Sequence, residues 1–164
     1  MKRRSLITIF AMLAGGLALI PAIGGIGGAT PQKCYVFTSN YNGNSISIID
    51  PITYTVDTSI TTAAGQPSGL SLSPDGETLY VAERFGDHVE IFDVATKASI
   101  GTVPIGSTTN DVIVSPNGEI AAVVKTDWGA SSIVFFSLAT NTITGSVTIP
   151  VDATNAAFTP DGTE

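Results

Sequence analysis

The chain has 164 residues, of which 43% are hydrophobic and only 13% are charged, so it has room for one modest hydrophobic core. Its 14 acidic residues outnumber its 7 basic residues and give a formal net charge of −7. Such a surface repels phosphate backbones, which argues against a nucleic-acid-binding protein.

The N-terminal segment has the pattern of an export signal. Three basic residues precede a nearly uncharged apolar run at 6–26, and small residues end the segment at Ala29. A positive cap, an apolar run and a small-residue exit are typical of a signal peptide, so we predict that residues 1–29 are removed. The pair Arg3-Arg4 is compatible with either general secretion or twin-arginine export. The alternative is an uncleaved membrane anchor, because the run approaches the roughly 20 residues that span a bilayer.

Export predicts a periplasmic, extracellular or cell-surface protein with an acidic surface. Removal of the signal leaves 4 basic and 14 acidic side chains, a formal charge of −10, which favours solubility and a cationic partner. Cys34 is the sole cysteine, so no internal disulfide can form. Pro31-Gln32-Lys33 precede it, unlike the small apolar residues before a lipid-attachment cysteine. We expect Cys34 to be a half-buried thiol at the start of a strand.

The residues after Cys34 have the composition of β-strands. They are rich in Thr, Val, Ile and Ser, and Gly, Pro, Asn and Asp separate their apolar runs. In the clearest stretch the pattern predicts strands at 69–73, 78–82, 88–93 and 98–103. Gly76 is expected to take a positive φ in the turn between the first two of these strands.

Two short phrases recur at nearly constant spacing. Copies of Ser-Pro-Asp-Gly, or a near variant, begin at Ser73, Ser115 and Thr159, which are 42 and 44 residues apart. Copies of a polar residue followed three places later by Thr begin at Asp50, Asp93 and Ser137, which are 43 and 44 residues apart. A repeat of this length built from strands is the period of a four-stranded propeller blade. The side chains of both phrases are expected to make local turn hydrogen bonds rather than to carry chemistry.

We therefore expect an all-β fold, a β-propeller of four-stranded antiparallel blades with about three blades present in an incomplete ring. The blade units are predicted at 35–66, 67–108 and 109–152, with a partial unit at 153–164 that contributes a lone inner strand at 155–158. Propellers close with about four to eight blades, so the chain is expected to be the N-terminal part of a longer propeller. The alternative is a six-bladed ring made by two copies of the chain.

The second unit resembles a known repeat family. It spells Pro67-x-Gly69-x-x-x-Ser73-Pro74-Asp75-Gly76-x-x-Leu79-Tyr80-Val81-Ala82, then Val89-x-Ile91-x-Asp93-x-x-Thr96. This pattern resembles the YVTN-type β-propeller repeat, and the resemblance covers residues 35–162. It implies an exported or cell-surface protein, such as the surface-layer proteins of archaea. Propellers similar to this one also include lactonase-like hydrolases and subunits of periplasmic dehydrogenases.

The resemblance implies that ligands bind at one face of the central channel, near the inner strands and the loops between second and third strands. Side chains suited to binding at these positions are Asn110, Asp111 and Asn155 beside the inner strands, and Arg84, Asp127 and Trp128 in the loops. Trp128 would stack on a sugar or a partner, or pack over its own blade.

The sequence favours a binding or cell-surface structural module over an enzyme. His88 is the sole histidine, which excludes a metal site built from several histidines of this chain, and no catalytic set, metal site or cofactor site is indicated. The expected partners are further blades of the same chain or a second copy, and a surface protein or carbohydrate. The alternative function is part of a propeller enzyme, a lactonase-like hydrolase or a periplasmic dehydrogenase subunit, with its active residues largely in other blades.

Overall fold

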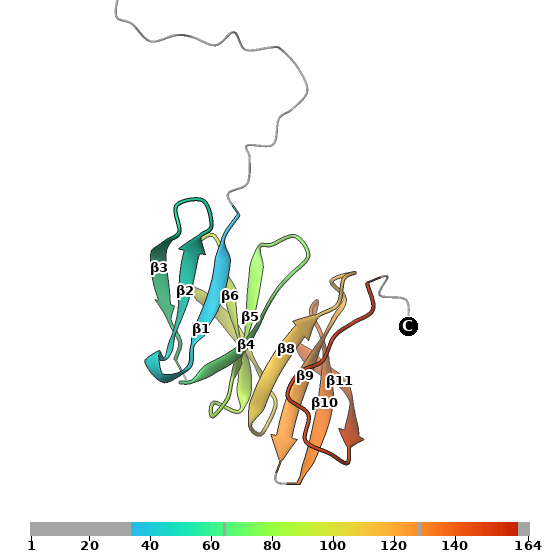
Figure 1. Cartoon of the computed structure of the whole chain (residues 1–164). Helices are drawn as coiled ribbons and strands as arrows, with labels where there is room; N and C mark the ends of the chain where they lie inside the picture. The colour runs from blue at the N-terminus through green and yellow to red at the C-terminus, as the bar shows by residue number, and fades with distance from the viewer. Residues whose placement is uncertain (1–33, 64, 128, 161–164) are drawn as a thin grey trace, which may run out of the picture. The chain divides into compact units, whose positions relative to one another are not determined.

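The computed structural model describes residues 34–63, 65–127 and 129–160, without the side chain of Asp127, and this part of the chain is all-β. Eleven strands form three antiparallel sheets, and within each sheet every strand lies beside the next one in sequence (Figure 1). The first sheet holds β1 (Val36–Asn40), β2 (Ser45–Asp50) and β3 (Thr55–Thr61), with a 3-10 turn, η1 (Tyr41–Gly43), after β1. The second holds β4 (Pro67–Leu72), β5 (Thr78–Glu83), β6 (His88–Asp93) and β7 (Ser99–Pro104). The third holds β8 (Thr109–Val114), β9 (Ile120–Asp127), β10 (Ala130–Ser137) and β11 (Thr142–Ile149).

The second sheet confirms the strands predicted from the repeat. β6 has the predicted bounds, β5 extends one residue further to Glu83, and β4 and β7 are shifted by one or two residues. The sheets of three, four and four strands match the three predicted units in order, and they form a propeller-like stack that does not close into a barrel within the described residues.

The expected twelfth strand at Asn155–Phe158 is wrong. This segment forms no ladder with any described strand, and a strand exists only through such a ladder. It instead follows a stretch tied to the third sheet by side chains. The Ser131 hydroxyl accepts the Ala153 N–H at 2.8 Å, and the Thr126 hydroxyl donates to the Ala153 carbonyl at 3.3 Å.

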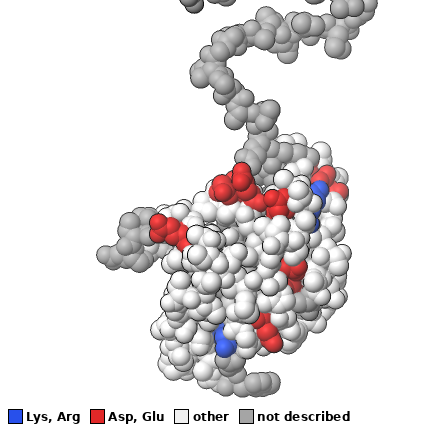
Figure 2. Space-filling model, turned by 180° about the vertical axis from the view of Figure 1, so that it is seen from behind, with Lys and Arg blue, Asp and Glu red and all other residues white. Residues whose placement is uncertain are grey.

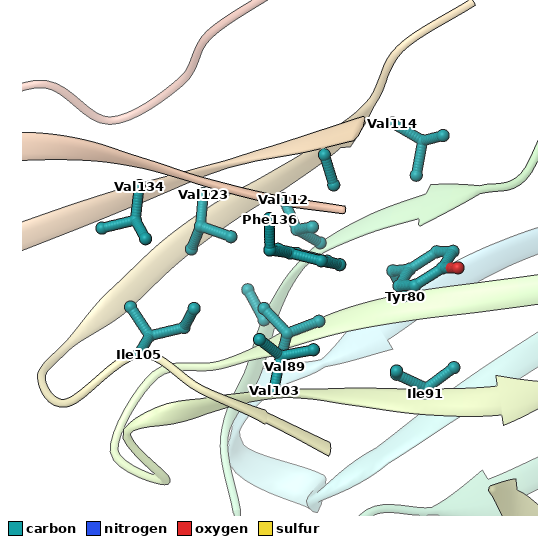
Figure 3. Packing of buried hydrophobic residues seen from close by; sticks show 12 residues of the cluster. Tyr80, Val89, Ile91, Val103, Ile105, Val112, Val114, Val123, Val134 and Phe136 are labelled. Carbon is teal, nitrogen blue, oxygen red and sulfur yellow. The ribbon is translucent and has the colours of Figure 1, made fainter. Parts of the chain in front are cut away.

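The second sheet is buried on both faces because its strands alternate apolar side chains between two neighbours. Leu79 and Val81 of β5 pack with β2 and β3 of the first sheet, whereas Tyr80 and Ala82 pack against the third sheet. In the second of these cores, Phe136 points from β10 toward Tyr80 (Figure 3), with ring centroids 5.9 Å apart. Two cores that share one sheet are the reason why the three sheets stack in sequence order.

The recurring phrases make the turns that were predicted from them. The Ser73 hydroxyl accepts the Thr78 N–H at 2.9 Å, and the Asp75 carboxylate accepts the Glu77 N–H at 3.0 Å, with Gly76 at φ +75°. The same bonds recur in the Ser115 copy. The Asp93 carboxylate accepts both the N–H and the hydroxyl of Thr96, which lowers the pKa of Asp93. These side chains are therefore architectural.

Adjacent inner strands approach most closely at Gly69 of β4. A Cβ placed there would lie 2.2 Å from the Asp111 carboxylate oxygen, 2.5 Å from the Asp111 Cα and 2.9 Å from the Val112 nitrogen of β8. Only glycine fits a backbone contact of this kind. The second and third sheets are thus brought together at their inner edges.

The N-terminal part of the described chain corrects one expectation. Cys34 is exposed rather than half-buried, because it precedes β1, which is the edge strand of its sheet. The predicted export signal at 1–29 and the last residues of the third Ser-Pro-Asp-Gly copy lie outside the described residues. Within the described residues, no helix is long and apolar enough to cross a membrane.

Candidate functional site

One end of the stack gathers the loops of both complete sheets. Because all four strands of a sheet are antiparallel, the β5–β6 loop and the β7–β8 linker come to the same end, and so do the β9–β10 loop and the segment after β11. We call this end the mouth. The turns made by the Ser-Pro-Asp-Gly phrases lie at the opposite end.

A cleft of about 730 Å³ opens at the mouth between the second and third sheets. We call it the mouth cleft. Three loops supply most of its lining: Arg84, Phe85 and Asp87 from the β5–β6 loop, Gly106, Ser107 and Thr108 from the β7–β8 linker, and Thr126, Gly129 and Asp152 from the third sheet and the segment after it. Hydroxyls, two carboxylates, one guanidinium and one aromatic ring therefore face the same space.

Backbone hydrogen bonds fix the walls of the mouth cleft. The Asp87 carbonyl accepts the N–H groups of Ile105 and Gly106 at 2.8 and 2.9 Å, which ties the β5–β6 loop to the β7–β8 linker. The Thr108 carbonyl accepts the Thr126 N–H at 3.0 Å, which ties that linker to β9. Asp87 holds a positive φ of 57°, as Asn44 does before β2 with 47° and Gly129 does before β10 with 85°. The cleft is therefore built on anchored loops.

Arg84 and Phe85 form the polar and aromatic parts of one wall. The Arg84 guanidinium carbon lies 5.8 Å from the centre of the Tyr41 ring and 5.9 Å from that of Phe85, within the range of a cation–π contact. Its Nε is buried and has no hydrogen-bond partner among the described residues. Phe85 is 61% exposed, which is unusual for a large apolar ring beside a cleft.

Two more buried polar atoms beside the mouth cleft have no partner within the described residues. They are the Ser107 hydroxyl, which lines the cleft, and the Asn110 side-chain oxygen. The Asn110 amide nitrogen donates a hydrogen bond to the Thr126 hydroxyl, so only the amide oxygen of Asn110 lacks a partner in the described part of the chain. Buried polar atoms are nearly always hydrogen-bonded in proteins, so these atoms mark hydrogen-bonding capacity that a ligand would use.

The structure places the six sequence-predicted residues in three groups. Arg84 lines the mouth cleft, and Asn110 contacts it through Thr126. Asp111 and Asn155 face each other, because the Asn155 amide donates to the Asp111 carboxylate at 3.5 Å. The prediction for Asp127 and Trp128 stays a prediction, since Trp128 and the Asp127 side chain lie outside the described residues.

Asp111 has a structural role and lies within β8 rather than before it. Burial raises the pKa of its carboxyl group, while N–H donation from Val112 and the Asn155 amide oppose that shift. Its carboxylate therefore joins an inner strand to the segment that follows the third sheet. Asp111 and Asn155 do not line the mouth cleft, and their role in ligand binding stays a prediction.

Sequence reasoning missed the contribution of the linkers between sheets. Ser107, Thr108 and Asp152 line the cleft although none belongs to an inner strand or to a β–β loop within a sheet. The topology could have pointed to them. In an antiparallel sheet of four strands, the linker that follows the fourth strand starts at the same end as the loop between the second and third strands. The described residues contain no group of three or more His, Cys, Asp or Glu arranged to hold a metal ion.

A second hollow, of about 420 Å³, lies at the opposite end between the same two sheets. Ser73, Asp75 and Asn117 in its lining already make the turn hydrogen bonds described above. On the face shown in Figure 2, acidic side chains lie at several separate places rather than in one patch. The mouth cleft therefore remains the better candidate for a binding site.

Comparison with known proteins supports the fold alone. No protein-family model matches the chain, and no curated protein matches it. Among solved structures it is similar to a chain of "Kuenenia stuttgartiensis Hydrazine Synthase", with a TM-score of 0.56 and 20% sequence identity. The match covers 78% of this chain and 50% of that chain, so this chain spans about half the length of its structural neighbour.

Proposed function

We propose that this protein is an exported β-propeller module of the cell surface or periplasm, and that its mouth cleft binds a polyhydroxylated ligand such as a saccharide. The observation that carries the proposal is the lining of the cleft, in which hydroxyls and charged groups surround an exposed phenylalanine ring. The predicted signal peptide and the resemblance to YVTN-type repeats support export to the surface.

The chemistry of the lining favours a saccharide over an anion. Sugar hydroxyls both donate and accept hydrogen bonds, which suits Asp87 and Asp152 as acceptors and Arg84 as a donor. The apolar C–H face of a sugar ring packs on an aromatic side chain such as Phe85. A phosphate or carboxylate ligand would meet two carboxylates for one guanidinium, on a chain that is already acidic.

For the outer face of the third sheet we propose a further sheet of the same repeat as partner. Ile113, Ala122, Ile133 and Phe135 line a gap of about 200 Å³ between this face and the segment Ala156–Phe158. An apolar sheet face of this kind is normally covered by another layer. Light scattering of the full chain tests the second-copy form of this proposal: a dimer supports a second copy as the partner, and a monomer excludes it.

The test of the binding function is calorimetric titration of the full chain with oligosaccharides selected on a glycan array. Arg84→Gln is expected to weaken binding about tenfold or more, because a charged hydrogen bond is lost. Phe85→Ala is expected to weaken it about fivefold through loss of ring contact.

Matched controls lie at the opposite end of the sheets. Lys97→Gln removes an exposed charge there, and Tyr54→Ala removes a ring that is 88% exposed. Both controls should bind as the wild type does. Equal affinity of all four variants and the wild type would refute the mouth cleft as the binding site.

A further inference from the structure

Two glutamates are enclosed between the first and second sheets, close to the mouth. Glu83 ends β5, and Glu90 lies in the middle of β6. Strand alternation directs both toward the first sheet, on the same face as Leu79, Val81 and Phe92. Glu83 is 0% exposed and Glu90 is 3% exposed.

The Glu83 carboxyl group lacks the donors that a buried carboxylate needs. Neither of its oxygens has a hydrogen-bond partner among the described residues. Thr62, which is 4% exposed, lies close enough to lower the pKa of Glu83, yet the contact lacks hydrogen-bond geometry and the Thr62 hydroxyl is itself without a partner. Thr62 is therefore not a hydrogen-bond donor to Glu83, because an ionised Glu83 carboxylate would draw the Thr62 hydroxyl into hydrogen-bond geometry. Glu90 accepts one bond, a long one of 3.3 Å from the Ala63 N–H.

Among the described residues, no cation lies against the two carboxyl groups. The Arg84 guanidinium faces the Tyr41 and Phe85 rings instead, and His88, opposite Glu83 in the ladder, donates from Nδ1 to the Gly86 carbonyl. The first sheet contributes Asp50 and Asp57 as its charged residues among those described, and both lie toward the other end of β2 and β3. β4 and β7 carry no charged residue.

The equivalent position in the first sheet shows that the repeat does not require an acid here. Asn40 ends β1 and pairs with Ser45, as Glu83 ends β5 and pairs with His88. The Asn40 amide donates to the hydroxyls of Ser45 and Ser47 at 3.0 and 2.8 Å, so its donor bonds are made. The third sheet has Lys125 at the matching place, opposite the start of its inner strand. The acid pair is therefore a property of the second sheet.

The Glu83 carboxyl group is enclosed without a hydrogen-bond donor or a cation among the described residues, and the nearby Glu90 charge repels a second negative charge, so burial favours the protonated form of Glu83. We propose that Glu83 holds one exchangeable proton beside Glu90, and that loss of this proton weakens the contact between the first and second sheets. The proton binds at one Glu83 oxygen and leaves to solvent, so no other reactant is needed. Because Arg84 follows Glu83, the same event alters the wall of the mouth cleft. The proposal does not depend on the identity of any ligand.

The pH range follows from the direction of the perturbation. Burial, with a smaller contribution from the Glu90 charge, raises the pKa of Glu83 to about 7 from 4.5. A carboxyl group whose pKa is raised in the folded state contributes stability that is present below the unfolded pKa. That contribution is lost as the pH rises through the folded pKa. The packing of the first sheet on the second is thus most stable in mild acid and less stable above neutral pH.

The test is urea denaturation of the full chain between about pH 5 and about pH 8. The unfolding equilibrium constant of the wild type is expected to rise on the order of 50-fold across this range through Glu83. Glu83→Gln should lack that component. Glu77→Gln, which changes an exposed glutamate beyond β4, should keep it, and His88→Gln should keep it as well.

A second measurement needs no variant and stands if Glu83→Gln fails to fold. The side-chain carboxyl ¹³C shift of Glu83 in the wild type should titrate with a midpoint near neutral pH. A midpoint below about pH 5, or an equal pH dependence in Glu83→Gln and the wild type, overturns the proposal. If millimolar calcium alone abolishes the loss of stability above neutral pH, the two glutamates hold a cation and the proposed Glu83 proton is wrong.

Discussion

Replacing Gly69 with alanine tests how closely the second and third sheets approach. The added Cβ would lie 2.5 Å from the Asp111 Cα and 2.9 Å from the Val112 nitrogen, and no side-chain rotation relieves either contact because both atoms belong to the β8 backbone. The carboxylate oxygen at 2.2 Å would have to move as well, which breaks its bond from the Val112 N–H. The inner strands β4 and β8 must therefore separate.

The expected cost lies at the upper end of what overpacking produces, about 3 kcal/mol. For a domain of this size that corresponds to a fall in Tm of about 10 °C. The measurement is thermal unfolding followed by circular dichroism, with Gly101→Ala and Gly145→Ala as controls. A Cβ at either control position meets no atom within 4 Å, so these variants should melt at or slightly above the wild-type Tm.

The outcome that would refute this reasoning is a Gly69→Ala protein that melts with its controls. It would mean that β4 and β8 are further apart than described, and that the close contact between the second and third sheets at Gly69 does not exist. A Gly69→Ala protein that keeps the wild-type Tm but no longer binds ligand would also contradict a steric clash as the effect of this substitution.

Three further predictions concern turns, core and acid stability. Gly76→Val should cost at least about 1 kcal/mol because residue 76 has φ +75°, whereas Gly101→Val, at a position without positive φ, should cost less; urea denaturation compares them. Phe136→Ala should cost about 3–5 kcal/mol because its ring is fully buried against Tyr80, and the exposed Phe85→Ala is the contrast in the same assay. Asp93→Asn should lower stability at neutral pH, because the bonds from Thr96 lower the Asp93 pKa; their contribution is complete above the unfolded pKa of 3.8 and is lost as the pH falls through the lower folded pKa. The difference between Asp93→Asn and the wild type should vanish in strong acid, and a difference that persists there would show that charge is not its cause.

The strands of the second sheet could be predicted because the local sequence pattern there matches the side-chain burial that the fold imposes. His88–Asp93 alternates polar and apolar residues as far as Ile91, and the turn phrases bound its neighbours, so β6 was predicted to the residue. Asn155–Phe158 has an equally apolar pattern but forms no strand, since pairing depends on a neighbour that no local pattern reveals. Tyr54, Lys97 and Asn141 all hold a positive φ at the same repeat position, and of these types only asparagine favours that conformation, so the sequence gives no consistent signal for it.

The candidate site was predictable as a region but not as a set of residues. Arg84 was identified from its loop, whereas Ser107 and Asp152 required knowledge of which end each linker returns to. The alternation of β5 would have placed Glu83 on a buried face, but its charge argued for exposure, and only the packing of the first sheet resolved the conflict. Asp111 was predicted to bind a ligand because it is polar beside an inner strand, and the hydrogen bonds that it makes to Val112 and Asn155 could not be read from the sequence.

The central claim is that a saccharide binds in the mouth cleft, and chemical-shift mapping of the full chain during titration with an oligosaccharide tests it most directly. We predict that the perturbed backbone amides gather at residues 84–87, 106–108 and 126–129, while those of the opposite turns at 73–76 stay unchanged. Perturbations centred on the turns, or spread evenly over the three sheets, would contradict the account.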